Sequence, residues 1–515
     1  MSGRSPTLVL GLDTLAFTAC FALWMLNGVL VTHLVEAQIF SFDQVQIGWL
    51  IGIPVLTGSL LRLPIGLLTD RYGGRRVFTL VLLASSLGAL LLSRAETYSG
   101  FVIGSLAFGL AGTSFAVGIA HTSSWFPSHR KGTALGVFGA GNAGSALTAV
   151  FAPGLLQRFT EGGQNPEGWR LLPLSFAILL AALAVVFFLL IPKDPPRRQA
   201  QRSLREELQV LRSVRVWRFG LYYFLVFGCF VALAQWLVPY YVSAFGVSLA
   251  TAGLLTAVFS FPSGVVRALG GWLSDRYGAR ITMYGVLAAC VIGCLLLSVP
   301  GMQITTPGES VSARFGGKVT EVRPDRVTVG DFRYSVRREA DQPQQDGGTL
   351  SVGTTQVPVV QVGDTVKKKQ LLARGTTHIE FNPSVWMFTA LVFAVGIAMG
   401  IGKAAVYKHI PDYFPDQVGA VGGLVGVIGG LGGFVCPILF GYLLRETGVW
   451  SSAWFFLFLL SAGSLAWMHS VVRGLERGRA SARMPATPAE QLADIEATSD
   501  PERSPAISLK GATAP

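Results

Sequence analysis

Long apolar stretches separated by short polar segments run through most of the chain. A helix needs about 20 mostly apolar residues to cross a hydrocarbon core of about 30 Å. The stretches that meet this length predict twelve transmembrane helices, roughly at 9–33, 45–69, 76–94, 99–125, 131–156, 170–192, 216–241, 247–274, 280–299, 384–410, 417–444 and 450–472. We therefore expect an all-α membrane protein. The first stretch is too long for a signal-peptide core, so it is predicted to be the first membrane helix.

The second and eighth stretches end in the same motif. One reads RLPIGLLTDRYGGRR from Arg62, and the other reads RALGGWLSDRYGAR from Arg267. Such a repeat predicts two parallel six-helix halves related by an axis along the membrane normal, which is typical of the major facilitator fold. The predicted organisation is an N-terminal half at 1–192, a linker at 193–215 and a C-terminal half at 216–301 and 382–472.

Composition and charge agree with a membrane protein. Hydrophobic residues make up 51% of the chain and charged residues only 14%, against about 25% charged in soluble proteins. The net charge of +12 reflects Lys and Arg in short loops, which collect on the cytoplasmic side, rather than a nucleic-acid partner. The basic link at 193–215 and the loops after the second, fourth and eighth helices share one side. We therefore expect a cytoplasmic (inner) membrane protein with both termini cytoplasmic.

Two segments do not follow the apolar pattern. Residues 302–381 are polar, with short strand-like patches between Gly, Pro and Asp turns. They predict a small β-rich insertion on the extracytoplasmic side. Within it VGDTVKKKQLLA, at 362–373, faintly resembles lipoyl- or biotinyl-type half-barrels, but a decoration without chemistry of its own is favoured. The tail at 473–515 is rich in Pro, Ala and Ser and is predicted to be disordered.

Arg62 and Arg267 lie deep in the predicted membrane. Each precedes the Asp of its motif by eight residues, which at 1.5 Å per residue places its backbone about 12 Å from the helix end. An arginine there costs about 2.5–3.5 kcal/mol and should face the bundle interior. The spans offer almost no carboxylate to neutralise the pair, and Asp13 lies near the start of the first helix. The pair therefore predicts an anion site; the alternative is that both arginines bind helix carbonyls.

The DRYG motifs supply four charged residues at the cytoplasmic ends of these helices: Asp70, Arg71, Asp275 and Arg276. Their glycines permit a tight turn, and their charged groups can form strong hydrogen bonds to neighbouring helix ends. The four residues are either gating elements that lock the cytoplasmic face in one state, or static anchors of the topology.

Two glycine-rich stretches carry a family resemblance. Residues 136–153, GVFGAGNAGSALTAVFAP, and residues 402–437, GKAAVYKHIPDYFPDQVGAVGGLVGVIGGLGGFVCP, resemble the two signatures of the nitrate/nitrite porter family, the NarK-like branch of the major facilitator superfamily. The resemblance extends over essentially all twelve helices and omits the insertion at 302–381 and the tail.

The resemblance implies where the substrate binds. In that family nitrate or nitrite lies midway through the membrane between two arginines, which fall here on Arg62 and Arg267. The family's neighbouring aromatic and amide residues fall on Phe115, Tyr223, Phe227 and Asn142. The chemistry agrees, because nitrate is planar and monovalent and a flat guanidinium fork suits its oxygens.

Coupling is left open by the sequence. Lys403 stands where many family members have a small or amide residue. As an intramembrane ionisable group it is a candidate for coupling, unless it snorkels to the cytoplasmic surface. The stretch GKAAVYKHIPDYFP resembles the proton-coupled uptake branch, whereas the few titratable groups in the spans, such as Asp13, His121 and Lys403, favour exchange.

The leading hypothesis is a secondary transporter of nitrate and nitrite that works by alternating access, as nitrate/proton symport or nitrate/nitrite exchange. A transporter of another small monovalent anion or carboxylate is the second, and a non-transporting receptor that senses a ligand through its β insertion is the third. An enzyme is not expected, because the sequence has no P-loop, zinc spacing or nucleophile motif. We expect no cofactor, a monomer and the lipid bilayer as its surroundings.

Overall fold

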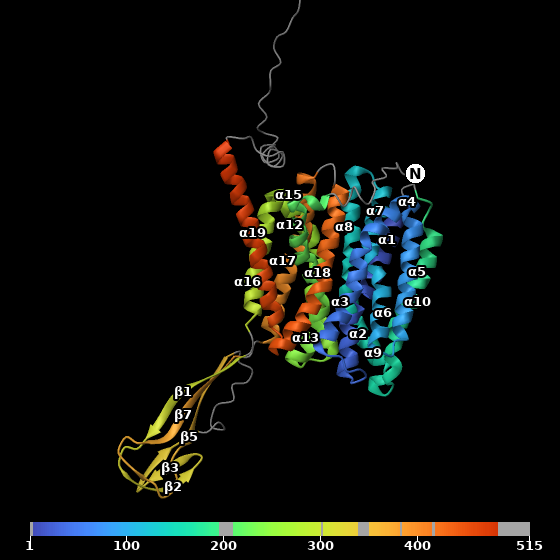
Figure 1. Ribbon diagram of the computed structural model, residues 1–515. Coiled ribbons are helices and arrows are strands. Elements are labelled where there is room, and N and C mark those ends of the chain that lie inside the picture. The colour runs from blue at the N-terminus through green and yellow to red at the C-terminus, as the bar shows by residue number, and fades with distance from the viewer. Residues whose placement is uncertain are drawn as a thin grey trace, which may run out of the picture. The chain divides into compact units, whose positions relative to one another are not determined.

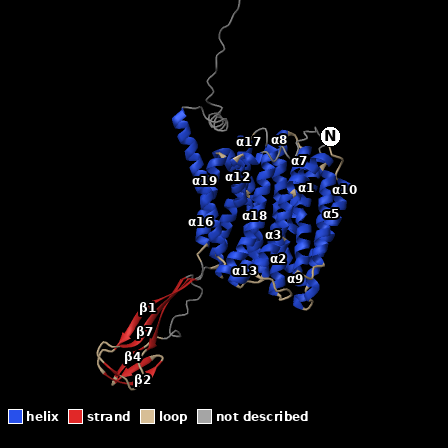
Figure 2. Ribbon diagram, viewed as in Figure 1, coloured by secondary structure: helices blue, strands red, loops and turns tan. Residues whose placement is uncertain are grey.

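The computed structural model describes residues 4–194, 210–299, 302–337, 350–381, 384–414 and 418–482. The chain divides into two compact units, Met1–Ser298 with Leu391–Pro515, and Val299–Ala390. A helical bundle forms the first unit, and the strands lie in the second (Figure 1, Figure 2).

The N-terminal half of the bundle contains six spans, several of which are broken into shorter helices. Its elements are α1 (Arg4–Trp24), α2 (Leu26–Glu36), α3 (Gln44–Leu60), α4 (Arg62–Tyr72), α5 (Gly74–Ser93), α6 (Tyr98–Phe108), η1 (Gly109–Thr113), α7 (Ser114–Trp125), α8 (Ser128–Gly139), η2 (Ala140–Ala143), α9 (Gly144–Phe159), η3 (Glu161–Gly163), η4 (Pro166–Arg170) and α10 (Leu171–Leu190).

The C-terminal half repeats this arrangement. Its elements are η5 (Val210–Arg212), α12 (Val214–Tyr223), η6 (Phe224–Gly228), α13 (Cys229–Phe245), α14 (Leu249–Val265), α15 (Arg267–Tyr277), α16 (Ala279–Leu297), α17 (Val385–Tyr413), α18 (Val418–Thr447) and α19 (Ser452–Ala482).

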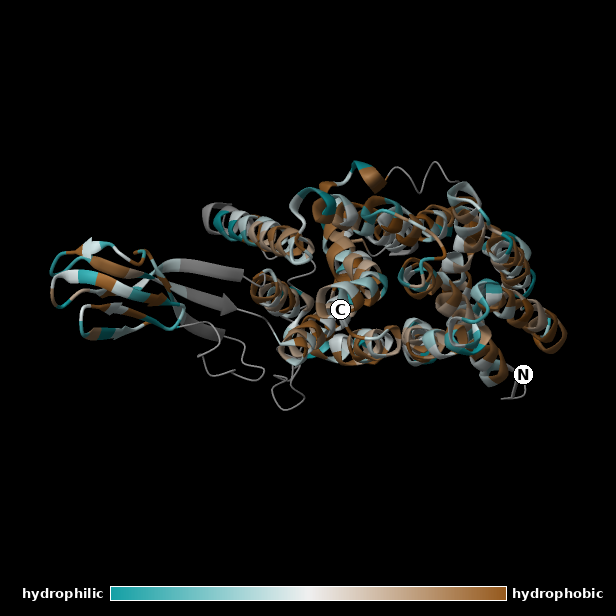
Figure 3. Cartoon of the chain, turned by 90° about the horizontal axis from the view of Figure 1, so that it is seen from below, coloured by the Kyte–Doolittle hydropathy of each residue, from teal (hydrophilic) through white to brown (hydrophobic). Residues whose placement is uncertain are grey.

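The prediction of twelve membrane spans is confirmed for the described residues. Eleven helical runs are long and apolar enough to cross a membrane, and α14 with α15, bent by 43°, makes the twelfth. Figure 3 shows hydrophobic residues along most of the bundle's helices. The predicted fifth span, 131–156, is not one continuous helix, because the 3₁₀ segment η2 interrupts it.

Both arginines of the repeat stand at helix breaks. Arg62 is the first residue of α4, and Arg267 is the first residue of α15. In the first case Pro64 explains the break, because it has no N–H to donate to the carbonyl of Leu60. In the second, Pro262 lies inside α14 shortly before the break. The equivalent spans are thus interrupted at the same place in both halves.

Tight glycine turns join these spans to the next helix at one end of the bundle. Gly73 has φ of 90° and Gly278 has φ of 85°, a conformation that glycine adopts at little cost. The turns lie at the end where α4, α7, α10 and α15 finish and where α8, α12 and α16 begin. Because the basic loops gather there, we refer to it as the basic end; in Figure 1 it is the upper end of the bundle.

The two halves approach each other closely toward the opposite end. A Cβ added to Gly48 of α3 would lie 2.4 Å from the carbonyl oxygen of Pro437 in α18, and one added to Gly253 of α14 would lie 2.0 Å from that of Ala149 in α9. No real Cβ fits at these distances, so glycine is what lets the backbones of the two halves meet.

The second unit is β-rich, as the sequence predicts. Its strands are β1 (Met302–Ser312), β2 (Gly317–Arg323), β3 (Arg326–Val329), β4 (Phe332–Ser335), β5 (Leu350–Pro358), β6 (Thr365–Val366) and β7 (Leu371–Phe381). They form one sheet in the order β1-β7-β5 and another in the order β4-β3-β2-β6, with antiparallel pairs. A small core that includes Val319, Val327 and Leu372 holds the unit together.

The predicted disordered tail is wrong at its start. Helix α19 continues to Ala482, ten residues beyond the predicted end of the twelfth span. The physical reason is that residues 473–482, RGLERGRASA, contain three Arg, two Ala, one Leu and one Glu, which favour helix, against two Gly, which do not, and no proline that would end it. The rest of the tail, 483–515, and most of the predicted linker lie outside the described residues.

Candidate anion site

The predicted site residues lie at irregular points of the spans. Arg62 and Arg267 begin the second segments of broken helices, and Phe115 follows the 3₁₀ segment η1. Asn142 lies within η2, and Phe227 lies within η6, a π-helical turn. Short 3₁₀ and π segments inside helices often mark functional positions. Irregular backbone therefore surrounds the middle of the bundle in both halves.

The structure brings Arg62 and Arg267 to one aromatic ring. The guanidinium carbon of each arginine lies 5.7 Å from the ring centre of Phe115. One arginine comes from the N-terminal half and the other from the C-terminal half, so the two cations converge on a point between the halves. This distance allows each guanidinium to interact with the negative face of the ring.

The two arginines are held differently. Arg62 is buried, and its Nε and Nη1 donate hydrogen bonds to the carbonyls of Gly112 (3.2 Å) and Gly426 (3.3 Å). The alternative, in which both arginines bind helix carbonyls, is thus met by Arg62 and not by Nη1 of Arg267. Nη1 of Arg267 is buried and has no hydrogen-bond partner among the described residues. Arg267 thus keeps donor capacity for a ligand, since a buried unpaired donor is costly.

Aromatic rings enclose the arginines on several sides. Phe227 lies 5.3 Å from the guanidinium of Arg62 and stacks on Tyr223 with ring centres 5.0 Å apart. Two further aromatic residues, Trp24 and Tyr407, were not predicted. Trp24 lies 5.4 Å from the guanidinium of Arg62, and Tyr407 lies 5.9 Å from that of Arg267. Tyr407 could have been found from its spacing, because it follows Lys403 by one helical turn.

Asn142 lies against α14 and makes no hydrogen bond to either arginine among the described residues. Its Nδ2 donates to the carbonyl of Gly139 (2.8 Å), and its Cβ is 3.8 Å from the place of a Cβ at Gly264. The asparagine is 3% exposed. It therefore packs where η2 faces the C-terminal half.

Lys403 is buried and does not reach the surface. It is 1% exposed, its Nζ donates to Oγ of Ser263 (3.2 Å), and the same nitrogen lies 3.0 Å from the ring centre of Phe230. The snorkelling alternative is therefore wrong. A hydroxyl and an aromatic face solvate this ammonium group inside the C-terminal half.

The four charged residues of the DRYG motifs lie at the basic end, away from the arginine pair. Asp70 and Arg71 are exposed, and Arg71 lies over the ring of Tyr72. Asp275 forms an ion pair with Lys408 of α17 (2.8 Å). Arg276 lies over the ring of Trp272 at 5.6 Å. Asp275 therefore ties α15 to α17 within one half.

A buried polar cluster in the N-terminal half joins groups that the sequence did not connect. His121 Nδ1 lies 2.8 Å from a carboxylate oxygen of Asp13, and its Nε2 lies 3.0 Å from one of Asp194. Thr122 donates to the other oxygen of Asp13 (2.7 Å). The cluster fixes α1, α7 and the segment after α10 to each other near the basic end.

A glycine stands one helical turn beyond each arginine on the side of the basic end. Gly66 and Gly271 follow Arg62 and Arg267 by one helical turn, so each shares a helix face with its arginine. A Cβ at either glycine would meet no atom within 4 Å. The halves are therefore in tight backbone contact near the opposite end, and no such contact is made at these two glycines.

Comparison with known proteins places the chain among transporters. The family model of the Major Facilitator Superfamily matches residues 12–312 and 371–508. A bacterial homolog of the lysosomal transporter Spinster, solved in an inward-facing and occupied conformation, has a TM-score of 0.62 and 14% identity, over 92% of this chain and 98% of that one. The nucleoside transporter NupG has a TM-score of 0.58 and 12% identity, over 90% and 99%. These two likenesses show the shared fold.

Sequence relatives are more specific. The probable nitrate/nitrite antiporter NarK1 of Thermus thermophilus is 41% identical over 468 residues, which cover 90% of this chain and 91% of that protein. The nitrite extrusion protein of Bacillus subtilis (strain 168) is 26% identical, over 85% of this chain and 88% of that protein.

Fold and relatives together define a multi-pass membrane transporter of the major facilitator type, not an enzyme. Within that superfamily, the chain belongs to the NarK-like nitrate/nitrite porter family.

Proposed function

We propose that this protein transports nitrate and nitrite across the cytoplasmic membrane by alternating access, with the anion held between Arg62 and Arg267. The observation that carries the proposal is that both guanidinium groups, one from each half, lie 5.7 Å from the same ring, Phe115. A site built from both halves can be exposed to either side of the membrane as the halves rock.

The lining suits a small planar anion. Two guanidinium groups offer flat arrays of N–H donors to oxygens that lie in one plane, and Nη1 of Arg267 has no protein partner among the described residues. Phe115 and Phe227 supply aromatic faces beside these donors. A weakly hydrated monovalent anion gives up little hydration energy in such a site, which favours nitrate and nitrite over strongly hydrated anions.

The basic end is proposed to face the cytoplasm, because loops rich in Lys and Arg stay on that side. The tight contacts at Gly48 and Gly253 would then close the extracytoplasmic side. The protein is proposed to act as a monomer in the inner membrane, since each chain contains a complete site.

Exchange is the favoured mode of coupling. Arg62, Arg267 and the buried Lys403 place three cationic side chains in the interior. Without an anion, the arginines would face each other unneutralised while the halves rock, which is costly in a low dielectric. An anion on each half-cycle removes this cost. In nitrate/proton symport, Lys403 or the Asp13–His121 pair would have to carry the proton.

Counterflow in proteoliposomes tests the proposal. Vesicles loaded with nitrate should accumulate labelled nitrite or nitrate without a pH gradient if the protein exchanges anions. Uptake that requires an inward proton gradient would instead establish symport. Counterflow of a small carboxylate but not of nitrate would favour the second candidate, a carboxylate transporter.

A further inference from the structure

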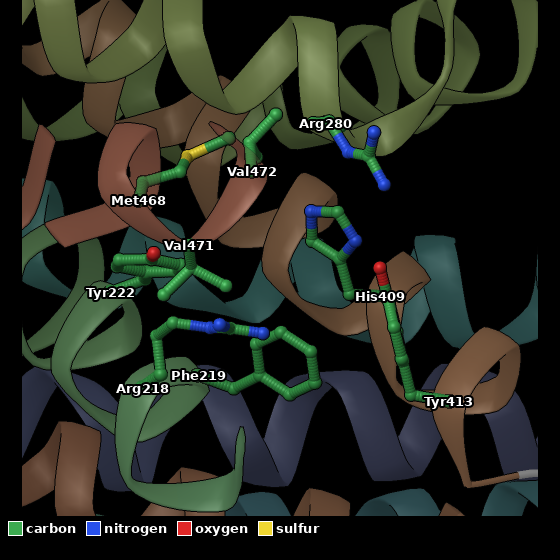
Figure 4. Close-up of a pocket in the computed structure, with 9 residues that line it drawn as sticks. All are labelled: Arg218, Phe219, Tyr222, Arg280, His409, Tyr413, Met468, Val471 and Val472. Carbon is green, nitrogen blue, oxygen red and sulfur yellow. The ribbon is translucent and has the colours of Figure 1, made fainter. Parts of the chain in front are cut away.

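A second cationic site lies in the C-terminal half, closer to the basic end than the arginine pair. Nine side chains line a pocket there: Arg218, Phe219, Tyr222, Arg280, His409, Tyr413, Met468, Val471 and Val472. They come from α12, α16, α17 and α19. Figure 4 shows Arg218 and Arg280 reaching the pocket from opposite sides, with His409 between them. The space in the pocket is about 30 Å³, enough for one or two oxygen-sized groups.

Two arginines and a buried tyrosine hydroxyl are the strongest donors of the pocket's lining. None of the nine described lining residues is an Asp or Glu. The side chain of Tyr222 is 2% exposed, and its hydroxyl has no hydrogen-bond partner among the described residues. Buried hydroxyl groups are nearly always paired. The hydroxyl is therefore available to a ligand that supplies an oxygen.

The internal repeat shows what fills the equivalent position in the other half. Gly11-Leu12 and Cys20-Phe21 of α1 recur 209 residues later as Gly220-Leu221 and Cys229-Phe230, which pairs Asp13 with Tyr222. His121 stands five residues before Phe126-Pro127, as His409 stands five residues before Phe414-Pro415. The DRYG repeat pairs Arg75 with Arg280.

The two equivalent histidines have opposite surroundings. In the N-terminal half, His121 lies between the carboxylates of Asp13 and Asp194, at 2.8 and 3.0 Å. In the C-terminal half, Tyr222 takes the place of Asp13, and His409 stacks on Phe219 with ring centres 5.5 Å apart. The N-terminal half thus places carboxylates around its histidine, whereas the pocket of the C-terminal half is lined by two arginines and by a tyrosine hydroxyl without a hydrogen-bond partner among the described residues.

We propose that this pocket binds a phosphate-bearing anion, supplied either by a phospholipid headgroup or by free phosphate. Its oxygens would accept hydrogen bonds from Arg218, Arg280 and the Tyr222 hydroxyl. Basic pockets between helices on the cytoplasmic side commonly bind such headgroups. The neighbouring surface suits acyl chains, because Met468, Val471 and Val472 form an apolar wall and Ile281, next to Arg280, is 65% exposed.

The test compares the full-length purified protein with the variants R218Q, R280Q and Y222F. Arg76, exposed at the basic end of the other half, gives the matched control R76Q. Native mass spectrometry measures retention of phosphatidylglycerol against phosphatidylcholine, and calorimetry with inorganic phosphate measures the free anion. Thermal stability and nitrate binding at the central site show that each variant is folded.

We expect phosphatidylglycerol to be retained over phosphatidylcholine and its affinity to fall roughly tenfold or more in R218Q and R280Q, because a charge-assisted bond is lost. It should fall several-fold in Y222F and stay unchanged in R76Q. Phosphate binding with this dependence, without lipid selectivity, would identify free phosphate as the ligand. If neither probe distinguishes the folded Y222F and arginine variants from R76Q, the site does not exist. If R218Q or R280Q does not fold, the comparison of Y222F with R76Q decides whether the site exists, because Y222F removes only one oxygen.

Discussion

Replacing Arg267 by Lys isolates the contribution of a planar guanidinium to anion binding. The variant keeps the positive charge but removes the fork of parallel donors. Arg267 is the better of the two arginines for this purpose. Its Nη1 has no partner among the described residues, so its donors are not occupied by backbone carbonyls as those of Arg62 are.

The expected loss follows from the bonds removed. A guanidinium can hold a planar anion by two charge-assisted bonds, and an ammonium on a flexible stem replaces them with one. Each such bond contributes about 1.5–3 kcal/mol, which corresponds to roughly a 10- to 150-fold weaker Kd. The Tm should change little, because no protein bond of Nη1 is lost. In R62K, by contrast, the carbonyls of Gly112 and Gly426 lose their donors, so both affinity and Tm should fall.

Calorimetric titration of the detergent-solubilised protein with nitrate provides the measurement, and the melting temperature provides the control for folding. The lysine variant at Arg76, which lies exposed at the basic end, is the matched control and should bind nitrate as the wild type does. A folded R267K protein with unchanged nitrate affinity would refute the assignment of Arg267 to the site.

Three further predictions rest on other parts of the structure. Gly48→Ala should slow exchange at least tenfold, because its methyl group would lie 2.4 Å from the carbonyl oxygen of Pro437. The methyl group of the control variant Gly66→Ala would meet no atom within 4 Å and should leave nitrate affinity unchanged. Equal transport rates in these two variants would contradict the close packing of the halves. In intact cells, a cysteine that replaces Arg76 should react only with a membrane-permeant maleimide, whereas a cysteine that replaces Ser99, exposed at the opposite end, should also react with an impermeant maleimide. The five native cysteines are buried and should not react. The reverse labelling pattern would show that the topology is inverted. Excision of 302–381 with a Gly/Ser linker should leave nitrate affinity nearly unchanged, and loss of binding by folded protein would show that the insertion shapes the site.

Much of the fold could be predicted because its signals are local. Apolar stretches of sufficient length indicate membrane spans, and the repeated DRYG motif indicates two equivalent halves. The same repeat placed Arg62 and Arg267 at matching depths before any contact was known. Their convergence on Phe115 could not be predicted in this way, however, because it depends on how the two halves pack in the tertiary structure.

The parts that sequence reasoning missed depend on long-range contacts or on helix irregularities. Trp24 is an ordinary apolar residue of the first span until α4 brings Arg62 within 5.4 Å of its ring. In the sequence Asp194 is one of several charged residues of a polar link, and only the fold places it 3.0 Å from His121. No proline marks the interruption of the fifth span at Asn142. The 3₁₀ turn there is accompanied by glycines packed tightly against α1, Gly141 and Gly144, and this packing is a long-range contact.

The unequal bonding of the two arginines has a consequence for alternating access. Arg62 belongs to the N-terminal half, yet its Nη1 donates to Gly426 of α18 in the C-terminal half, while its Nε donates to Gly112 of its own half. The first bond links the halves in the middle of the bundle, and the second keeps the side chain in place. An anion that competes for Nη1 would loosen the link without releasing Arg62 from its own half. Binding energy at the centre would then be coupled directly to the contact between the halves, and a ligand shifts such an equilibrium only through contacts that differ between its states.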